Sequence, residues 1–293
     1  MRSLLFVPGD SPKKLEKGLS SGADALIVDL EDSVSPENKA LARTTTLAFL
    51  DQIGKSPKRP YLLVRINGLD TGLTDADLDV IVGGRPDAVM LPKAEGGPAV
   101  IHLDAKLAAR EAIHNVPAGA IKIFALATET ASALFLGGTY AGASQRLSGL
   151  TWGAEDLAVE LGSETNRDED GRFTGPYLFA RNLCLAAAAA AKIQAIDTVY
   201  VDYRNADGLR REAIEARRDG FTAKMAIHPA QVEIINEVFT PSPNTIANAR
   251  AIIAAFAANP KAGVVGIDGK MYDRPHLARA QQVIKQAQAA GVG

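Results

Sequence analysis

Seven polar residues stand at the ends of apolar runs that have the composition of β-strands, and a helical pattern follows each run. In a closed barrel of parallel strands, the carboxyl ends of all strands meet at one mouth, where the active site lies. Side chains spread over about 200 positions would therefore converge on one small volume. These residues are Asp29, Glu31, Arg65, Lys93, Glu129, Asp156 and His228.

Glu129 and Asp156 follow the fifth and sixth predicted strands, which are neighbours in such a barrel. Two carboxylates at one mouth repel each other unless a proton or a cation lies between them. Hard oxygen donors without a His or Cys cluster suit Mg²⁺, which keeps water ligands and is completed by substrate oxygens. The pair therefore predicts a magnesium site, although each acid alone would also suit a helix N-cap or the surface.

Arg65 ends the third strand inside the otherwise apolar run YLLVRIN. Its planar guanidinium can bind a carboxylate in bidentate fashion, so we expect it to bind an anionic substrate. An ion pair with Asp29 or Glu31 is the alternative, and both roles could hold together. Strand alternation sends Asp29 and Glu31 to one face, where we include them among the substrate-binding residues, with a cap or ion-pair role equally open.

Lys93 could form a Schiff base, as in metal-free aldolases, but only its strand-end position supports this, and an anion-binding or structural role is favoured. His228 and Pro229 precede a helix, so backbone amides there could bind a phosphate, with capping as the alternative. Lys13 and Lys14 on the first helix could meet an anionic cofactor tail or simply face solvent.

Strands and helices alternate at intervals of about 25–35 residues, which is typical of βαβ units and a parallel sheet. Eight such units favour a TIM (β/α)8 barrel over residues 1–240. A doubly wound dinucleotide-binding sheet is disfavoured because the first strand leads into PGDSP and not into a G-x-G-x-x-G turn. Strands are expected at 3–8, 23–31, 60–67, 86–93, 120–129, 147–153, 195–203 and 221–228.

The strand–helix rhythm ends near Thr240, where two prolines mark a loop. Residues 241–293 predict a helix at 245–258, an irregular stretch GVVGIDGKMYD and a last helix at 275–290. We predict that this segment is too short for a domain. It should form a C-terminal helical extension that packs on the barrel or on a neighbouring subunit.

Composition narrows the function classes. The chain of 293 residues has a formal net charge of −2, which predicts no bulk attraction to nucleic acid or to an anionic membrane. Its one cysteine, Cys184, excludes a disulfide framework within the chain and fits a cytoplasmic protein. The N-terminal apolar run is too short for a signal peptide, and no run is long enough for a membrane span.

The motifs, in their order and spacing, resemble the citrate lyase β-subunit-like proteins of the HpcH/HpaI aldolase superfamily, with malyl-CoA and citramalyl-CoA lyases as relatives. The resemblance runs nearly end to end. It implies a TIM barrel, Mg²⁺, a coenzyme A (CoA) thioester and carbon–carbon bond cleavage. The motifs that carry it are RSLLFVPGDSPKKLEKG, DLEDSVSPENKALAR, VRINGLDTG, LPKAE, ALATETASA, GLTWGAEDLA, MAIHPAQV and GKMYDRP.

The resemblance also implies roles for individual residues. Glu129 and Asp156 would be the Mg²⁺ ligands, Arg65 would bind the carboxylate of a keto or hydroxy acid, and Ala154 with Glu155 would offer backbone amides near the metal. Asp273 would be the catalytic acid/base, delivered from the C-terminal segment and often across a subunit boundary of a homotrimer or hexamer. The residues that would hold CoA are Phe6, Pro8, Lys13, Ile227, His228 and Pro229.

The leading functional prediction is a Mg²⁺-dependent lyase that joins or separates an acetyl-type CoA thioester and a small 2-keto acid. The alternatives are a malyl-CoA-type thioesterase, a citrate lyase β subunit that uses an acyl carrier protein thioester, a Schiff-base aldolase through Lys93, and a binding module without turnover. The acidic loop at 162–173 matches no role.

Overall fold

The computed structural model describes residues 1–54 and 56–292. Within these residues, eight strands close into a barrel in which each strand pairs in parallel with the next and β8 pairs with β1. This confirms the predicted fold class. The strands are β1 (Ser3–Pro8), β2 (Ala25–Asp29), β3 (Tyr61–Arg65), β4 (Ala88–Leu91), β5 (Lys122–Leu126), β6 (Leu147–Thr151), β7 (Gln194–Asp197) and β8 (Ala223–Ala226).

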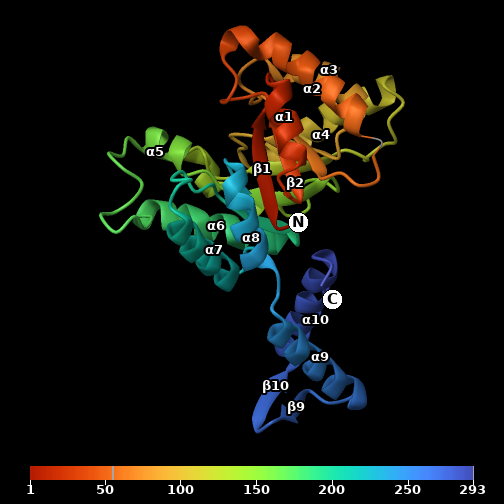
Figure 1. Ribbon diagram of the computed structural model, residues 1–293, viewed down its shortest axis with the longest axis vertical. Helices are drawn as coiled ribbons and strands as arrows, with labels where there is room; N and C mark the ends of the chain where they lie inside the picture. The colour runs from red at the N-terminus through yellow and green to blue at the C-terminus, as the bar shows by residue number, and fades with distance from the viewer. Residues whose placement is uncertain (55, 293) are drawn as a thin grey trace.

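Helices surround the barrel in the order in which they follow the strands (Figure 1). The connection from β5 to β6 differs from the others, because it carries the short 3₁₀ helices η3 (Ser132–Phe135) and η4 (Gly137–Tyr140) in place of an α-helix. Paired glycines in η4 disfavour a longer helix there. The barrel helices are α1 (Pro12–Leu19), α2 (Lys39–Ile53), α3 (Thr74–Ile81), α4 (Gly96–Ile113), α5 (Glu155–Leu161), α6 (Gly175–Ala191), α7 (Ala206–Asp219) and α8 (Val232–Phe239).

Two apolar layers hold the barrel together, because successive side chains of a strand point to opposite faces. The inner layer fills the barrel and the outer layer packs beneath the helices, which explains why the strands are apolar almost throughout. The inner layer is formed by Leu4, Ala25, Ile27, Leu63, Ala88, Met90, Phe124, Leu126, Ile196, Ala223 and Met225.

A buried ionic cluster fixes β7 and β8 to the surrounding helices. Lys224 is fully buried, and its ammonium donates to Asp197 at 2.7 Å and to Glu212 of α7 at 2.9 Å. Asp197 also accepts from the indole nitrogen of Trp152 at 2.8 Å. Because a buried charge without a partner is costly, these contacts fix the positions of the last two strands and of the segment that follows β6.

The C-terminal extension forms a lobe of its own beyond the barrel (Figure 1). It comprises α9 (Pro243–Ala258), β9 (Val264–Ile267), β10 (Lys270–Asp273) and α10 (Arg274–Ala289), with a small apolar core that includes Phe256. The end of α10 lies across a cavity from residues at the amino ends of the barrel strands, such as Met1 and Gln194. The lobe therefore lies at the end opposite to the mouth.

The stretch predicted to be irregular is an antiparallel hairpin, so that prediction was wrong. Asp268 and Gly269, at its turn, both have positive φ, at 49° and 74°. An Asp-Gly pair is a strong hairpin signal, because a tight two-residue turn needs this backbone conformation at both positions. The signal was therefore present in the sequence.

No helix in the part of the chain that the structure describes is both long and apolar enough to cross a membrane.

Candidate active site

A cavity of about 410 Å³ opens at the carboxyl ends of the barrel strands. Its wall combines carboxylates and one guanidinium with apolar side chains from β1, β5 and β8. A few convergent polar groups in an apolar cavity are typical of a small-molecule site. The lining residues are Phe6, Pro8, Asp29, Asp32, Ser33, Arg65, Leu126, Glu129, Gly153, Ala154, Glu155, Asp156, Thr198, Val199, Met225 and Ile227.

Glu129 is a buried carboxylate in the segment after β5, with only 3% of its surface exposed. Its Oε2 accepts a hydrogen bond of 2.6 Å from the backbone amide of Lys93, and no cationic side chain lies within ion-pair distance of it among the described residues. Burial, together with the nearby charges of Asp156 and Glu31, raises the pKa of Glu129 to about 8. The carboxylate form therefore needs a cation beside it.

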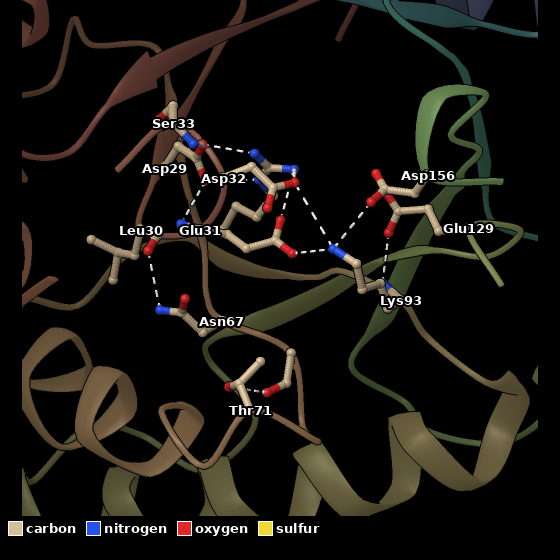
Figure 2. Close-up of polar contacts among 12 residues, drawn as sticks. Asp29, Leu30, Glu31, Asp32, Ser33, Asn67, Thr71, Lys93, Glu129 and Asp156 are labelled. Atoms are coloured by element: carbon tan, nitrogen blue, oxygen red, sulfur yellow. Dashed lines mark hydrogen bonds and ion pairs between the residues drawn. The ribbon is translucent and has the colours of Figure 1, made fainter. Parts of the chain in front are cut away.

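Asp156 lies in the first turn of α5, on the next strand–helix unit, and its side chain is about one-third exposed. Figure 2 shows its carboxylate beside that of Glu129. Two oxygen donors leave the remaining coordination positions to water and substrate, as Mg²⁺ prefers. Among the residues described, no group of three or more His, Cys, Asp or Glu side chains could hold a metal ion. The pair therefore suits Mg²⁺ better than a zinc site closed by protein ligands.

Gly153 makes room for the Glu129 side chain. A Cβ atom at Gly153 would lie 2.8 Å from Glu129 Cγ and 2.9 Å from its Oε1. The sequence prediction missed this residue. The glycine is visible in the motif GLTWGAEDLA. Its contact with Glu129 is not, because Gly153 follows β6 whereas Glu129 follows β5.

Arg65 is held by Asp29 in a bidentate pair, with Nε–Oδ1 and Nη2–Oδ2 distances of 2.7 Å. Burial acts to lower the pKa of Arg65, but the hydrogen bonds and charge of Asp29 outweigh it, and the pKa is raised. The guanidinium also lies 4.8 Å from the ring centre of Phe6. Arg65 therefore stays charged with its orientation fixed, and the N–H groups that neither Asp29 nor the nearby Glu31 occupies remain for an anion in the cavity.

Asp29 accepts four hydrogen bonds, two from Arg65 and two from the backbone amides of Glu31 and Ser33 at 2.9 and 3.1 Å. Burial acts to raise the pKa of Asp29, but these partners outweigh it and the pKa is lowered. With both oxygens engaged, Asp29 orients Arg65 and has little capacity left for a substrate. The ion-pair alternative for Asp29 is confirmed, and a contact of Asp29 with the substrate stays a prediction, since Asp29 also lines the cavity.

Glu31 lies between two cations. Its Oε2 is 2.8 Å from Arg65 Nη1, an ion pair without hydrogen-bond geometry, and its Oε1 accepts from Lys93 Nζ at 2.6 Å. Burial acts to lower the pKa of Lys93, but Glu31 and the other nearby acids outweigh it, and the pKa is raised. A Schiff-base nucleophile must be a neutral amine, so this environment disfavours that role for Lys93.

A second cavity, of about 350 Å³, adjoins the first, with which it shares Phe6, Pro8 and Ile227. His228 and Pro229 also line it, which brings five of the six predicted CoA-binding residues together. Its cationic side chains are Lys14 and Lys17 of α1.

Lys13 does not join this set, because it lines a separate groove between α1 and α2. Lys17 was missed in the sequence. It lies three residues after Lys14 but also four residues after Lys13, so helical spacing places it near both. Only the fold shows that it shares the second cavity with Lys14. His228 acts as a cap, because its Nδ1 accepts a hydrogen bond of 3.2 Å from the backbone amide of Ala230.

Asp273 is not brought to the mouth by its own chain. It is the N-cap of α10 in the extension, and its side chain is 51% exposed. A hydrogen bond from His276 lowers the pKa of Asp273 and so keeps its carboxyl group ionised. Any contact between Asp273 and a barrel mouth therefore has to come from another copy of the chain.

Comparisons with known proteins cover the whole of this architecture. Residues 2–229 match the family described as HpcH/HpaI aldolase/citrate lyase, and residues 177–292 match the C–C bond lyase of the TIM-barrel fold. This chain belongs to the HpcH/HpaI aldolase/citrate lyase family.

Individual relatives of this HpcH/HpaI protein are similar over nearly their full length. The chain is 36% identical over 290 residues to citrate lyase subunit beta of Leuconostoc mesenteroides subsp. cremoris. The matched region covers 98% of this chain and 93% of that protein. The (3S)-malyl-CoA thioesterase of Cereibacter sphaeroides is also 36% identical over 290 residues, with 98% and 95% covered. The crystal structure of CitE from Mycobacterium tuberculosis with magnesium, acetoacetate and coenzyme A has a TM-score of 0.79 at 32% identity and covers 98% of both chains.

Gly153→Ala should weaken Mg²⁺ binding to this HpcH/HpaI protein by about 10–100-fold, because the added methyl group displaces Glu129. Calorimetric titration with MgCl₂ measures the change. Gly138→Ala is the matched control, since nothing lies within 4 Å of a Cβ there. Unchanged Mg²⁺ affinity in a folded Gly153→Ala protein would contradict the placement of the metal beside Glu129.

Proposed function

We propose that this protein is a Mg²⁺-dependent carbon–carbon lyase that makes or breaks the bond between an acetyl-type CoA thioester and a small 2-keto acid. The observation that carries the proposal is the Glu129–Asp156 pair at the wall of the mouth cavity, beside the oriented guanidinium of Arg65. Membership of the HpcH/HpaI family supports the same reaction class.

The proposed chemistry divides between the two ends of the substrate. Magnesium, when bound, supplies Lewis-acid polarisation of the keto acid oxygens. Glu129 and Asp156 hold that ion, and Arg65, fixed by Asp29, binds the keto acid carboxylate and so orients the carbonyl group. In the condensation direction, Asp273 takes a proton from the methyl carbon of the thioester, that carbon attacks the carbonyl carbon, and the alkoxide so formed takes up a proton to become the hydroxyl group. In cleavage, a base removes the hydroxyl proton, the carbon–carbon bond breaks, and Asp273 returns a proton to the methyl carbon.

The second cavity is proposed to take the CoA portion of the thioester. Its apolar walls suit the pantetheine arm, while the ammonium groups of Lys14 and Lys17 at its edge suit the phosphates. CoA carries more phosphate charge than the phosphopantetheine of an acyl carrier protein. We therefore favour a CoA thioester, with the carrier protein as the alternative substrate. A cytoplasmic location is part of the proposal.

We further propose that the active unit is a homo-oligomer, a trimer or hexamer, in which residues 241–293 of one chain complete the site in the barrel, residues 1–240, of another. The position of Asp273 at the end opposite to the mouth supports this arrangement. Two exposed apolar side chains of the hairpin that ends at Asp273, Val264 and Met271, are candidates for that contact with another chain.

The proposed reaction is tested by incubating the protein with acetyl-CoA or propionyl-CoA and glyoxylate, pyruvate or oxaloacetate. Carbon–carbon bond formation and release of free thiol are followed separately. We expect bond formation that needs Mg²⁺, stops with EDTA and falls about 1000-fold or more in Glu129→Gln and Asp156→Asn.

Thiol release without any new carbon–carbon bond would overturn the lyase and favour the thioesterase. Turnover of carrier-protein thioesters alone would favour the citrate lyase β subunit. Full activity in either variant would overturn the metal assignment.

The site between subunits is tested by complementation. Asp273→Asn should lower kcat by about 10²–10⁴-fold, because only the proton transfer is lost. Co-expression with Glu129→Gln, under different affinity tags, should restore activity in purified mixed oligomers, since one variant supplies an intact barrel and the other an intact extension. Mixed oligomers as inactive as the separate variants would show that Asp273 does not act across a subunit boundary.

The assignment of the CoA cavity is tested with a matched pair of lysines on α1. Lys17→Ala should raise the KM for the CoA thioester about tenfold with kcat largely kept, because a charge-assisted contact with phosphate is lost. Lys13→Ala should leave KM unchanged, because Lys13 lines the groove between α1 and α2 and not the second cavity. Equal effects of the two substitutions would argue against the second cavity as the CoA site.

A further inference from the structure

Lys93 lies at the centre of a cluster of acidic side chains. The proposed reaction gives Lys93 no role. Its Nζ is 2.6 Å from Glu31 Oε1, 3.4 Å from Asp156 Oδ1 and 3.9 Å from Asp32 Oδ2. Figure 2 shows the ammonium between Glu31 on one side and the Glu129–Asp156 pair on the other. One fixed positive charge is therefore within 4 Å of three carboxylates.

The backbone of Lys93 adds a second contact with the same pair. Its φ is 49°, in the left-handed region that residues other than glycine rarely occupy. In this conformation, the amide donates to Glu129 at 2.6 Å while the side chain reaches Asp156 and Glu31. Strained backbone of this kind persists where the surrounding structure holds it, and it gathers at functional sites. Lys93 thus contacts both proposed metal ligands, Glu129 through its backbone amide and Asp156 through its side-chain ammonium.

The charge of the ammonium has a direct electrostatic consequence. A cation at the Glu129–Asp156 pair is attracted by the two carboxylates and repelled by the Lys93 ammonium, which lies 3.4 Å from one of their oxygens. Glu31 keeps the ammonium in place at 2.6 Å, and only about 29% of the Lys93 side chain is exposed, so solvent screens the repulsion only in part.

We propose that Lys93 is a positioning residue whose ammonium limits the Mg²⁺ affinity of the Glu129–Asp156 pair, so that firm binding of the ion depends on the oxygens of a bound keto acid. The inference rests on the proposed function, because it assumes that this pair holds the metal. The keto acid adds negative charge and oxygen ligands to the site, which offsets the ammonium.

The test is calorimetric titration of MgCl₂ into the EDTA-treated, dialysed full-length protein, without and with pyruvate. Pyruvate should tighten Mg²⁺ binding in the wild type. Lys93→Met, which keeps the length of the side chain and removes the charge, should bind Mg²⁺ more tightly without pyruvate, on the order of tenfold. The gain from pyruvate should shrink in the same variant.

Two further variants separate charge from packing. Lys93→Arg keeps the charge and should stay close to the wild-type affinity. Lys106→Met removes the same charge from the exposed pair with Asp75 and should leave the affinity unchanged. Thermal unfolding checks that each variant is folded. Unchanged or weaker Mg²⁺ binding in folded Lys93→Met would overturn the inference, and so would a Lys93→Arg variant that behaves like Lys93→Met.

Glu129→Gln distinguishes this failure from a failure of the proposed function. If Glu129→Gln retains wild-type Mg²⁺ binding, the metal assignment itself fails. If Glu129→Gln loses Mg²⁺ binding and Lys93→Met does not gain affinity, only the role given to Lys93 fails.

Discussion

The site depends on one constraint, the cost of burying the carboxylate of Glu129. Within the described residues, the contact that holds this side chain is a single backbone amide, and burial raises its pKa to about 8. A buried carboxylate in this setting either binds a proton or attracts a cation. Gly153 leaves room for the Glu129 side chain. Asp156, at the start of α5, adds a second negative charge nearby and so strengthens the attraction for a cation.

Alternating charges connect Asp156, the acid beside Glu129, to the other side of the mouth. Asp29 pairs with Arg65, Arg65 with Glu31, Glu31 with Lys93, and Lys93 with Asp156, at distances from 2.6 to 3.4 Å. Because each charge in this series has a neighbour of opposite sign, the barrel can hold these acids near one cavity. The same series fixes the guanidinium of Arg65 and the ammonium of Lys93 in place. This fits the proposals that Arg65 binds the keto acid carboxylate and that Lys93 limits the affinity for Mg²⁺.

The fold divides the proposed machinery between two ends of the molecule. The barrel gathers Glu129, Asp156 and Arg65 at its mouth, whereas Asp273 lies in a lobe at the other end. This separation is the reason for proposing that the active unit is a homo-oligomer. In the proposed function, the barrel of one chain binds the keto acid, and Asp273 in the C-terminal extension of a neighbouring chain transfers the proton.

The sequence by itself determined the barrel, because the apolar runs and their spacing are local properties and parallel closure then brings strand ends such as Glu129 and Asp156 to one mouth. Tertiary structure alone decided which groups face each other. It engaged both oxygens of Asp29 with Arg65 and directed Lys17, and not Lys13, toward the second cavity. The reason is physical: a side chain's partners depend on the direction of its Cα–Cβ bond and on elements far away in the chain, and neither is contained in a local pattern.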